Sequence, residues 1–169
     1  SVADKAGKIS GVSKVIAAKS PVFENYDAAA WAEAIDSVST SGIIVTSASA
    51  QSKDLAARLA ARRTISVVQD VIAIEDGKIS TPIYSGKAIQ NVSVNGDSVI
   101  SVRANIFAPA DNSGSCDVQV IDTTGNVTTA LQEMVQRASE RLDVSEANII
   151  ISGGRGMGTP ANFSHLEDI

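Results

Sequence analysis

The chain has 169 residues, of which 44% are hydrophobic and 20% charged, so it contains enough apolar material for a folded core. Its formal net charge of −5 argues against a nucleic-acid or anionic-membrane binder, because such proteins usually carry a basic field. One cysteine, Cys116, excludes an internal disulfide, and one histidine, His165, adds too little for a usual zinc site or a catalytic triad. No apolar run approaches the roughly 18–20 residues that cross a bilayer. The composition predicts a soluble, reduced, globular protein that is poor in catalytic side chains.

The first half of the chain alternates strand and helix patterns. After a short polar segment, apolar runs predict strands at 14–18 and 42–46. A helix is predicted over 27–38, with Asp27 as its N-cap and with Trp31, Ile35 and Val38 on one face. A second helix is predicted over 52–63, capped by Ser52. This order is typical of parallel βαβ units, so both strands are expected in one sheet flanked by the two helices.

The pattern then changes to closely spaced strands. Apolar or alternating runs predict strands at 71–74, 79–84, 88–94 and 99–102, with no helix between them. Asn95-Gly96 separates two alternating segments and predicts a β-hairpin. Residues 107–125 are rich in small and polar residues and are expected to form a loop. The fold class is therefore α/β in three layers, with a largely parallel sheet and an antiparallel hairpin extension.

The last third begins a new α/β unit. A helix is predicted over 128–142, a strand over 147–151, and then a glycine loop over 152–158. Thr159-Pro160 resembles an N-cap followed by proline at the first helical position, so a helix should open there. Because the pattern starts inside a helix-like segment and stops early in this unit, we expect a fragment of a longer α/β protein.

The glycine loop is the best candidate for chemistry. Glycines permit close approach of a ligand, and a helix N-terminus with Arg155 beside it favours a phosphate or pyrophosphate. Gly154 and Gly156 occupy the first two positions of a dinucleotide-binding pattern, but Thr159 stands where its third glycine should be. No Gly-Lys-Ser/Thr follows, so the loop is not a P-loop. From its shape alone, phosphate binding and a simple tight turn are about equally favoured.

Several segments together resemble the electron transfer flavoprotein α-subunit family. Ile150-Ile-Ser-Gly-Gly-Arg-Gly156 is similar to the segment that opens the FAD-binding domain of that family. Further matches occur in order and at family spacing across nearly the whole chain: Ala6–Val15, Ser47–Ala50, Lys53–Ala61, Asp70–Ile74, Ile83–Ala88 and Ser101–Arg103. The chain departs from the family pattern at Ala57, Thr81 and Lys87, where the family usually has Pro, Arg and Asn.

The resemblance implies how the chain is divided into domains and that the protein takes part in electron transfer. It implies an N-terminal α/β domain over 1–125 that lacks its first strands, and over 126–169 a linker helix and the start of a truncated FAD-binding domain. It implies a non-catalytic electron carrier that binds one FAD and pairs with a β-subunit. It implies that the carrier accepts electrons from acyl-CoA and other dehydrogenases in fatty-acid β-oxidation and passes them to a quinone oxidoreductase. Arg155, Gly154 and Gly156 fall on flavin-binding positions; most other flavin contacts in the family lie in segments with no counterpart here.

The resemblance implies a cytoplasmic protein in a bacterium or a mitochondrial matrix protein in a eukaryote. No metal, nucleic acid or membrane span is implied. Two other classes stay open: an adenine-nucleotide-binding α/β domain without flavin, and a structural heterodimerisation domain.

The sequence also predicts the surroundings of several single residues outside these motifs. His165 should face solvent, Cys116 should be a free thiol without a role, and Trp31 should pack in the core. Three arginines on the second helix, Arg58, Arg62 and Arg63, are expected to form a solvated face or a surface covered by a partner. Arg103, at a strand end, is a candidate for an ion pair.

Overall fold

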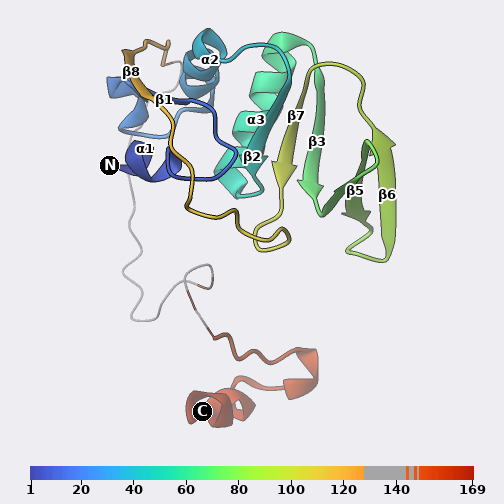
Figure 1. The fold of residues 1–169 in the computed structure, drawn as a ribbon. Helices are drawn as coiled ribbons and strands as arrows, with labels where there is room; N and C mark the ends of the chain where they lie inside the picture. Colours follow the sequence, from blue (N-terminus) through green and yellow to red (C-terminus); the bar gives the residue numbers. More distant parts are fainter. Residues whose placement is uncertain (128–143, 145–146, 148) are drawn as a thin grey trace. The chain divides into compact units, whose positions relative to one another are not determined.

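The computed structural model describes residues 1–127, 144, 147 and 149–169, which fall into two compact units, Ser1–Ala130 and Leu131–Ile169 (Figure 1). The helix expected over 128–142 lies outside the described residues. The first unit contains three helices and eight strands in its described part, together with one 3-10 turn. In chain order they are α1 (Val2–Ala6), β1 (Val15–Lys19), the turn at Pro21–Phe23, α2 (Ala28–Val38), β2 (Ile43–Ser47), α3 (Ala50–Arg63), β3 (Ser66–Val71), β4 (Ala73–Glu75), β5 (Lys78–Ile83), β6 (Ala88–Ser93), β7 (Ser98–Val102) and β8 (Val118–Asp122).

A three-stranded parallel sheet forms the centre of the first unit. Its order is β2-β7-β3, so β7 hydrogen-bonds to a parallel neighbour along both edges. Adjacent residues of a strand point to opposite faces of a sheet. Val99 and Ile100 of β7 are 0% and 2% exposed, so both faces of the sheet are covered at this strand.

Helix α3 covers one face of this sheet, and α2 packs alongside α3 (Figure 1). Leu55 and Leu59 of α3 pack with Ala32 of α2 against Val99, and Trp31 and other half-buried side chains extend this cluster. On the opposite face, Ile100 packs with Val71 and Ile79 and so joins the parallel sheet to the antiparallel one. The α/β class expected from the sequence is therefore confirmed, with helices, a parallel sheet and an antiparallel extension.

Local capping signals define where the two helices begin. The amide of Ala30 donates to Asp27 Oδ1 at 2.8 Å, which confirms Asp27 as the N-cap of α2. The prediction that Ser52 caps the next helix is wrong. The cap is Ser49, whose Oγ accepts a hydrogen bond from the Ser52 amide at 3.2 Å, so α3 begins two residues earlier than expected. Three serines in six residues offer equivalent hydroxyls, and only the backbone path decides which one caps.

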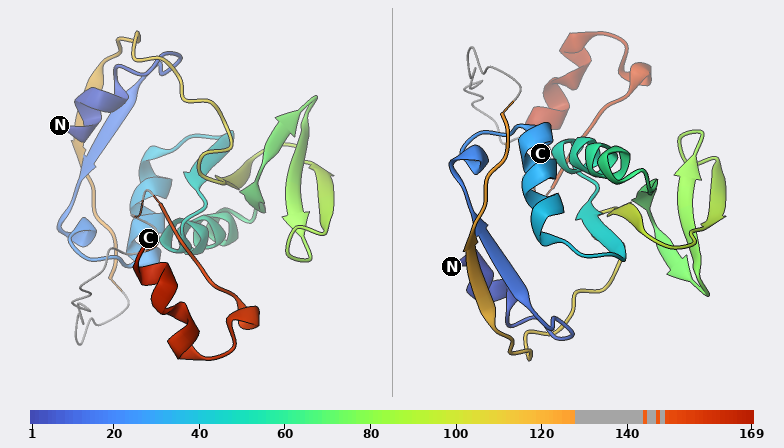
Figure 2. Two further views of the ribbon diagram at one scale, coloured as in Figure 1. Left: turned by 90° about the horizontal axis from the view of Figure 1, so that it is seen from below. Right: turned by 90° about the horizontal axis from the view of Figure 1, so that it is seen from above.

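The prediction that the strands at 14–18 and 42–46 share a sheet is wrong. β1 pairs in parallel with β8, and the pair forms a separate two-stranded sheet. Figure 2 shows this pair on the far side of α2 from α3. The partner strand β8 lies within the 107–125 segment expected to be a loop. Its five residues are flanked by small and polar residues, and parallel pairing between segments so distant in sequence leaves no local signal.

The hairpin expected at Asn95-Gly96 is also absent. β6 pairs with β5, whereas β7 lies in the parallel sheet, so the Asn95-Gly96 turn connects two different sheets. The two-residue hairpin is at Asp76-Gly77 instead, between β4 and β5. Both residues have positive φ, 48° and 73°, as a type I′ turn requires. The alternating residues on either side of Asn95-Gly96 correctly predict two strands, but they do not show which strands these pair with. The first four residues of β7 are buried, and a buried strand is most stable at the centre of a parallel sheet, here between β2 and β3.

The described part of the second unit is short and irregular. It contains 3-10 turns at Arg155–Met157 and Pro160–Phe163, followed by the four-residue helix α4 (Ser164–Glu167). Residues 149–151, which belong to the strand expected over 147–151, form no strand, and their isoleucines are exposed. A strand forms only when its backbone hydrogen-bonds to a neighbouring strand, so the apolar pattern of residues 149–151 does not produce a strand by itself.

We expect Ser98→Ala to stabilise the first unit and Ser101→Ala to destabilise it. Both serines are 0% exposed on β7, but the Ser98 hydroxyl has no hydrogen-bond partner, whereas Ser101 Oγ accepts from the Asp70 amide at 3.0 Å. Removing an unpaired hydroxyl should add about 1 kcal/mol to the free energy of unfolding, and orphaning the Asp70 amide should remove about 1–3 kcal/mol. Urea unfolding measures both. Equal destabilisation by the two substitutions would contradict this difference.

Candidate functional site

The glycine loop of the second unit is held by its own backbone. The amide of Met157 donates to the Gly154 carbonyl at 3.0 Å, and the Gly158 amide donates to the Arg155 carbonyl at 3.2 Å. Asn162 Nδ2 donates to the Met157 carbonyl at 2.6 Å, which ties the loop to the turn that follows it. The segment from Gly154 to Gly158 is therefore a closed 3-10 turn with Arg155 at its start.

One glycine of the loop is required by packing. A Cβ at Gly153 would lie 2.6 Å from Phe163 Cε1 and 2.7 Å from Met157 Cγ, so a larger residue forces these side chains to move. Gly154 and Gly156, in contrast, have no atom within 4 Å of an added Cβ. Open space therefore lies on both sides of Arg155, whose side chain is exposed. This is the arrangement that a ligand approaching the backbone closely would need.

The expected helix N-terminus contributes less than the sequence suggests. Thr159 stands at the N-cap position, but its side chain makes no capping hydrogen bond. The chain then forms a 3-10 turn and only four residues of α-helix. A helix dipole needs several aligned turns, so this short helix adds little positive potential to the loop, and Arg155 supplies the formal positive charge there.

A second group of polar side chains gathers at the carboxyl end of the parallel sheet. Arg103 directly follows β7 and donates to both carboxylate oxygens of Asp70, from Nε at 3.1 Å and from Nη2 at 2.6 Å. Asp70 lies near the end of β3, where the register shifts between Val68 and Val71 and the Asp70 backbone becomes left-handed, with φ of 63°. The carboxyl ends of parallel strands meet at one sheet edge, which is why residues 33 positions apart form this pair.

Positive charge exceeds negative charge at this edge. Lys53, in the second turn of α3, places Nζ 3.8 Å from Asp70 Oδ1, so two cations face one carboxylate. Hydrogen bonds from Arg103, more than the nearby Lys53 charge, hold the pKa of the Asp70 carboxyl below its usual value against an opposing effect of burial. The ion pair expected of Arg103 is confirmed, and it forms within the first unit.

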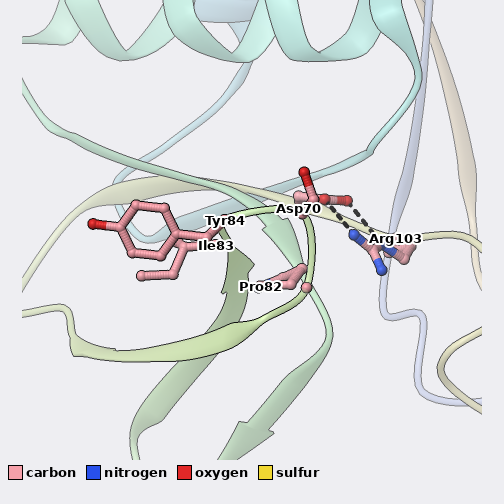
Figure 3. Close-up of a pocket in the computed structure, with 7 residues that line it drawn as sticks. Asp70, Pro82, Ile83, Tyr84 and Arg103 are labelled. Carbon is pink, nitrogen blue, oxygen red and sulfur yellow. Dashed lines mark hydrogen bonds and ion pairs between the residues drawn. The ribbon is translucent and has the colours of Figure 1, made fainter.

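An open pocket of about 340 Å³ adjoins this ion pair. Asp70 and Arg103 line one part of it, and the turn from Pro82 to Gly86 lines the rest. In Figure 3 the Tyr84 ring extends to one side of the turn and the ion pair lies on the other. The sequence contains no signal for this pocket, because its two parts come from different sheets that only tertiary packing brings together.

The turn that lines the pocket has an unusual backbone. Tyr84, Ser85 and Gly86 all have positive φ, at 51°, 55° and 83°. Such a conformation is uncommon outside glycine, and here hydrogen bonds from the Gly86 amide to Ile83 and from the Lys87 amide to Tyr84 close the turn. Tyr84 is 76% exposed, so a large aromatic side chain is held at the surface.

The arginines of α3 do not form a solvated face as a group. Arg63 is only 14% exposed; its Nε donates to Asp36 Oδ1 at 2.6 Å and its Nη2 to the Ser39 carbonyl at 2.8 Å, which fastens α3 to the C-terminus of α2. Arg62 also pairs with Asp36, and these bonds, from Arg63 first, lower the pKa of the Asp36 carboxyl. Of these three arginines, Arg58 alone makes a single, exposed ion pair, in which its Nε lies 3.4 Å from Asp54 Oδ1.

The other singled-out residues have simple surroundings. His165 is exposed as expected, and Cys116 is a half-buried free thiol. Trp31 packs against the helix–sheet cluster, makes edge contacts with Phe23 and Tyr26, and donates from Nε1 to the Val22 carbonyl at 2.9 Å, so core packing is confirmed. Among the described residues, His, Cys, Asp and Glu form no group of three that could hold a metal ion, and no helix is long and apolar enough to span a membrane.

Comparison with known proteins identifies the family of this α/β chain. The family model named "Electron transfer flavoprotein domain" matches residues 1–144. The chain therefore belongs to the electron transfer flavoprotein family.

Within that family, the sequence of this chain is similar to those of α-subunits. It is 30% identical to the electron transfer flavoprotein subunit alpha of Bacillus subtilis over 94% of this chain and 52% of the relative. It is 31% identical to the same subunit of Paracoccus denitrificans over 99% of this chain and 56% of that protein. The mitochondrial subunit alpha of Oryza sativa subsp. indica is 29% identical over 94% of this chain. The chain spans about half the length of these curated relatives.

We expect Asp70→Asn to reduce the acid sensitivity of the first unit. The carboxyl pKa is lowered in the folded state, so its stabilising effect is complete above the unfolded value of about 4 and is lost as the pH falls through the folded value. The difference in free energy of unfolding between the two proteins should be at most about 1 kcal/mol near pH 7 and should shrink towards pH 3. Asparagine tolerates the left-handed backbone of this position, so the comparison isolates the charge. Denaturant unfolding across this pH range measures it; a constant difference would contradict the assignment.

Proposed function

We propose that the chain is part of the α-subunit of a heterodimeric electron carrier that contains FAD. The carrier accepts electrons from acyl-CoA and other dehydrogenases during fatty-acid β-oxidation and passes them to a quinone oxidoreductase. The observation that carries this proposal is the family match over 144 consecutive residues, supported by relatives whose names specify subunit alpha. The compartment that follows is the cytoplasm of a bacterium or the mitochondrial matrix of a eukaryote.

The first unit supplies a scaffold rather than a reaction centre in this proposal. Its polar groups at the sheet edge, Asp70 and Arg103, pair with one another. Such a unit suits subunit pairing. The proposed partner is the β-subunit of the same family.

The second unit supplies the start of the cofactor site. FAD, when bound, carries the electrons, and the protein positions and tunes it. The loop fits this role in two respects: Arg155 is exposed, and the flanking Gly154 and Gly156 leave open space beside the backbone. Arg155 would supply planar, charged donors to an acceptor on the cofactor, and the glycines would allow it to approach. One loop is a small part of such a site, so the chain of residues 1–169 should not retain FAD alone.

The proposal is tested by mixing the 169-residue chain with an electron transfer flavoprotein β-subunit. We expect a one-to-one complex in size-exclusion chromatography with light scattering, because the first unit is compact and has its own apolar clusters. The chain alone should show no stoichiometric flavin absorbance near 450 nm. Absence of any complex would remove the support for a subunit role, and yellow flavin bound by the chain alone would contradict the assignment of most cofactor contacts to other segments.

We expect Arg155→Ala, in a full-length α-subunit carrying this sequence, to weaken FAD binding about 10- to 150-fold. The loss of one charge-assisted hydrogen bond corresponds to about 1.5–3 kcal/mol. Arg155→Lys should restore only part of the affinity, because an ammonium cannot reproduce a planar fork. The exposed side chain makes little contribution to packing, so the melting temperature of the apoprotein should not change. Flavin titration and thermal unfolding measure the two effects. Unchanged affinity would mean that the loop is only a structural turn.

A further inference from the structure

The pocket at the sheet edge carries more positive than negative charge. Arg103 and Asp70 line it, and Lys53 reaches the same carboxylate. Lys87, exposed, directly follows the pocket-lining Gly86 and adds a third cation. The neighbouring Asp54 is engaged elsewhere, by Tyr26 and Arg58. The chain as a whole has a net charge of −5, so this local excess of cations is opposite to its average surface.

In the part of the chain that the structure describes, the Asp70–Arg103 ion pair leaves one nitrogen of the arginine free to donate to a second acceptor. Asp70 accepts from Nε and Nη2 of Arg103, and within the described residues Nη1 has no recorded acceptor. The Arg103 side chain is 45% exposed, so Nη1 can be reached from solvent. A carboxylate placed there would pair with Arg103, and the positive charges of Lys53, 3.8 Å from Asp70 Oδ1, and of the exposed Lys87, next in the chain to the pocket-lining Gly86, favour an acidic ligand.

The rim of the pocket also presents an aromatic anchor. Tyr84 is 76% exposed on a turn closed by two backbone hydrogen bonds, so its ring is displayed with little freedom in the backbone beneath it. Tyrosine and arginine are the side chains most often found as anchors of protein interfaces. Tyr84 and Arg103 line the same open pocket from opposite sides of the turn, an arrangement that suits an extended polypeptide better than an enclosed small molecule.

We propose that the pocket between the Asp70–Arg103 pair and the turn at 82–87 receives an acidic segment of the β-subunit. A carboxylate of that segment pairs with Arg103 Nη1, the positive charge of Lys87 on the adjoining turn adds to the attraction, and Tyr84 packs against the backbone of the segment. This inference rests on the proposed role as an α-subunit, and it adds the place and the charge of the contact. The charge complementarity of the site is the reason for choosing an acidic partner.

The test compares the affinity of the 169-residue chain and of three variants for a purified β-subunit by calorimetric titration. Lys87→Glu reverses a charge at the pocket, and Tyr84→Asn removes the ring with a residue that tolerates a left-handed backbone. Lys14→Glu is the matched control, since Lys14 is exposed in the chain segment before β1. We expect Lys87→Glu and Tyr84→Asn each to weaken binding at least 10-fold and Lys14→Glu to change it less than 2-fold. Binding by the unmodified chain should weaken with added NaCl, and less so in Lys87→Glu.

The outcomes separate this inference from the function on which it rests. If the unmodified chain binds the β-subunit but both pocket variants bind within 2-fold of it, the pocket is not part of the interface and the inference is wrong. An equal loss in Lys14→Glu and Lys87→Glu would show only a general charge effect and would also overturn it. If the unmodified chain does not bind at all, the proposed subunit role fails, and the inference falls with it. Thermal unfolding of each variant confirms that the fold is intact.

Discussion

The burial of β7 on both faces and along both edges is the constraint on which the first unit depends. Val99 faces the α2 and α3 helices and Ile100 faces the antiparallel extension, so one strand joins the two apolar clusters. Its parallel neighbours β2 and β3 meet it through backbone hydrogen bonds. A strand in this position has no solvated surface, and its two fully buried serines show how strictly the space is filled.

The polar edge of the sheet is a consequence of that central strand. The parallel direction of β3 and β7 brings their carboxyl ends together, which places Arg103 beside Asp70. The bulge in β3 and the Ser101 hydroxyl hold the Asp70 backbone in a left-handed conformation that a regular strand would not adopt. The pocket between this pair and the Tyr84 turn thus owes its shape to packing between two sheets. The second unit is different, because its glycine loop is shaped by contacts within about ten residues.

Local chemistry explains what could be predicted. The spacing of Trp31 and Ile35 and the cap at Asp27 are properties of one helix, and both were readable without knowing the neighbours. The same holds for the glycine loop around Arg155, since a run of glycines is a local signal for a turn; within it, Gly153 is the position where an added Cβ would meet close contacts. Family membership was also readable, since several short matching segments keep their order and spacing along the chain. These signals depend on neighbours in sequence.

The amino-acid sequence by itself determined the α/β class, the two main helices, the approximate positions of most strands, the family and the glycine loop. Only the tertiary structure decided which strands pair: β1 with β8, and β7 between β2 and β3 instead of in a hairpin with β6. It also decided that Arg63 is half-buried between α2 and α3 and that a pocket lies beside Arg103. The physical reason is that a strand's alternation of apolar residues describes its two faces, whereas its partners are selected along its edges. The backbone groups on those edges are the same in every residue except proline, so the choice depends on how the whole core is filled.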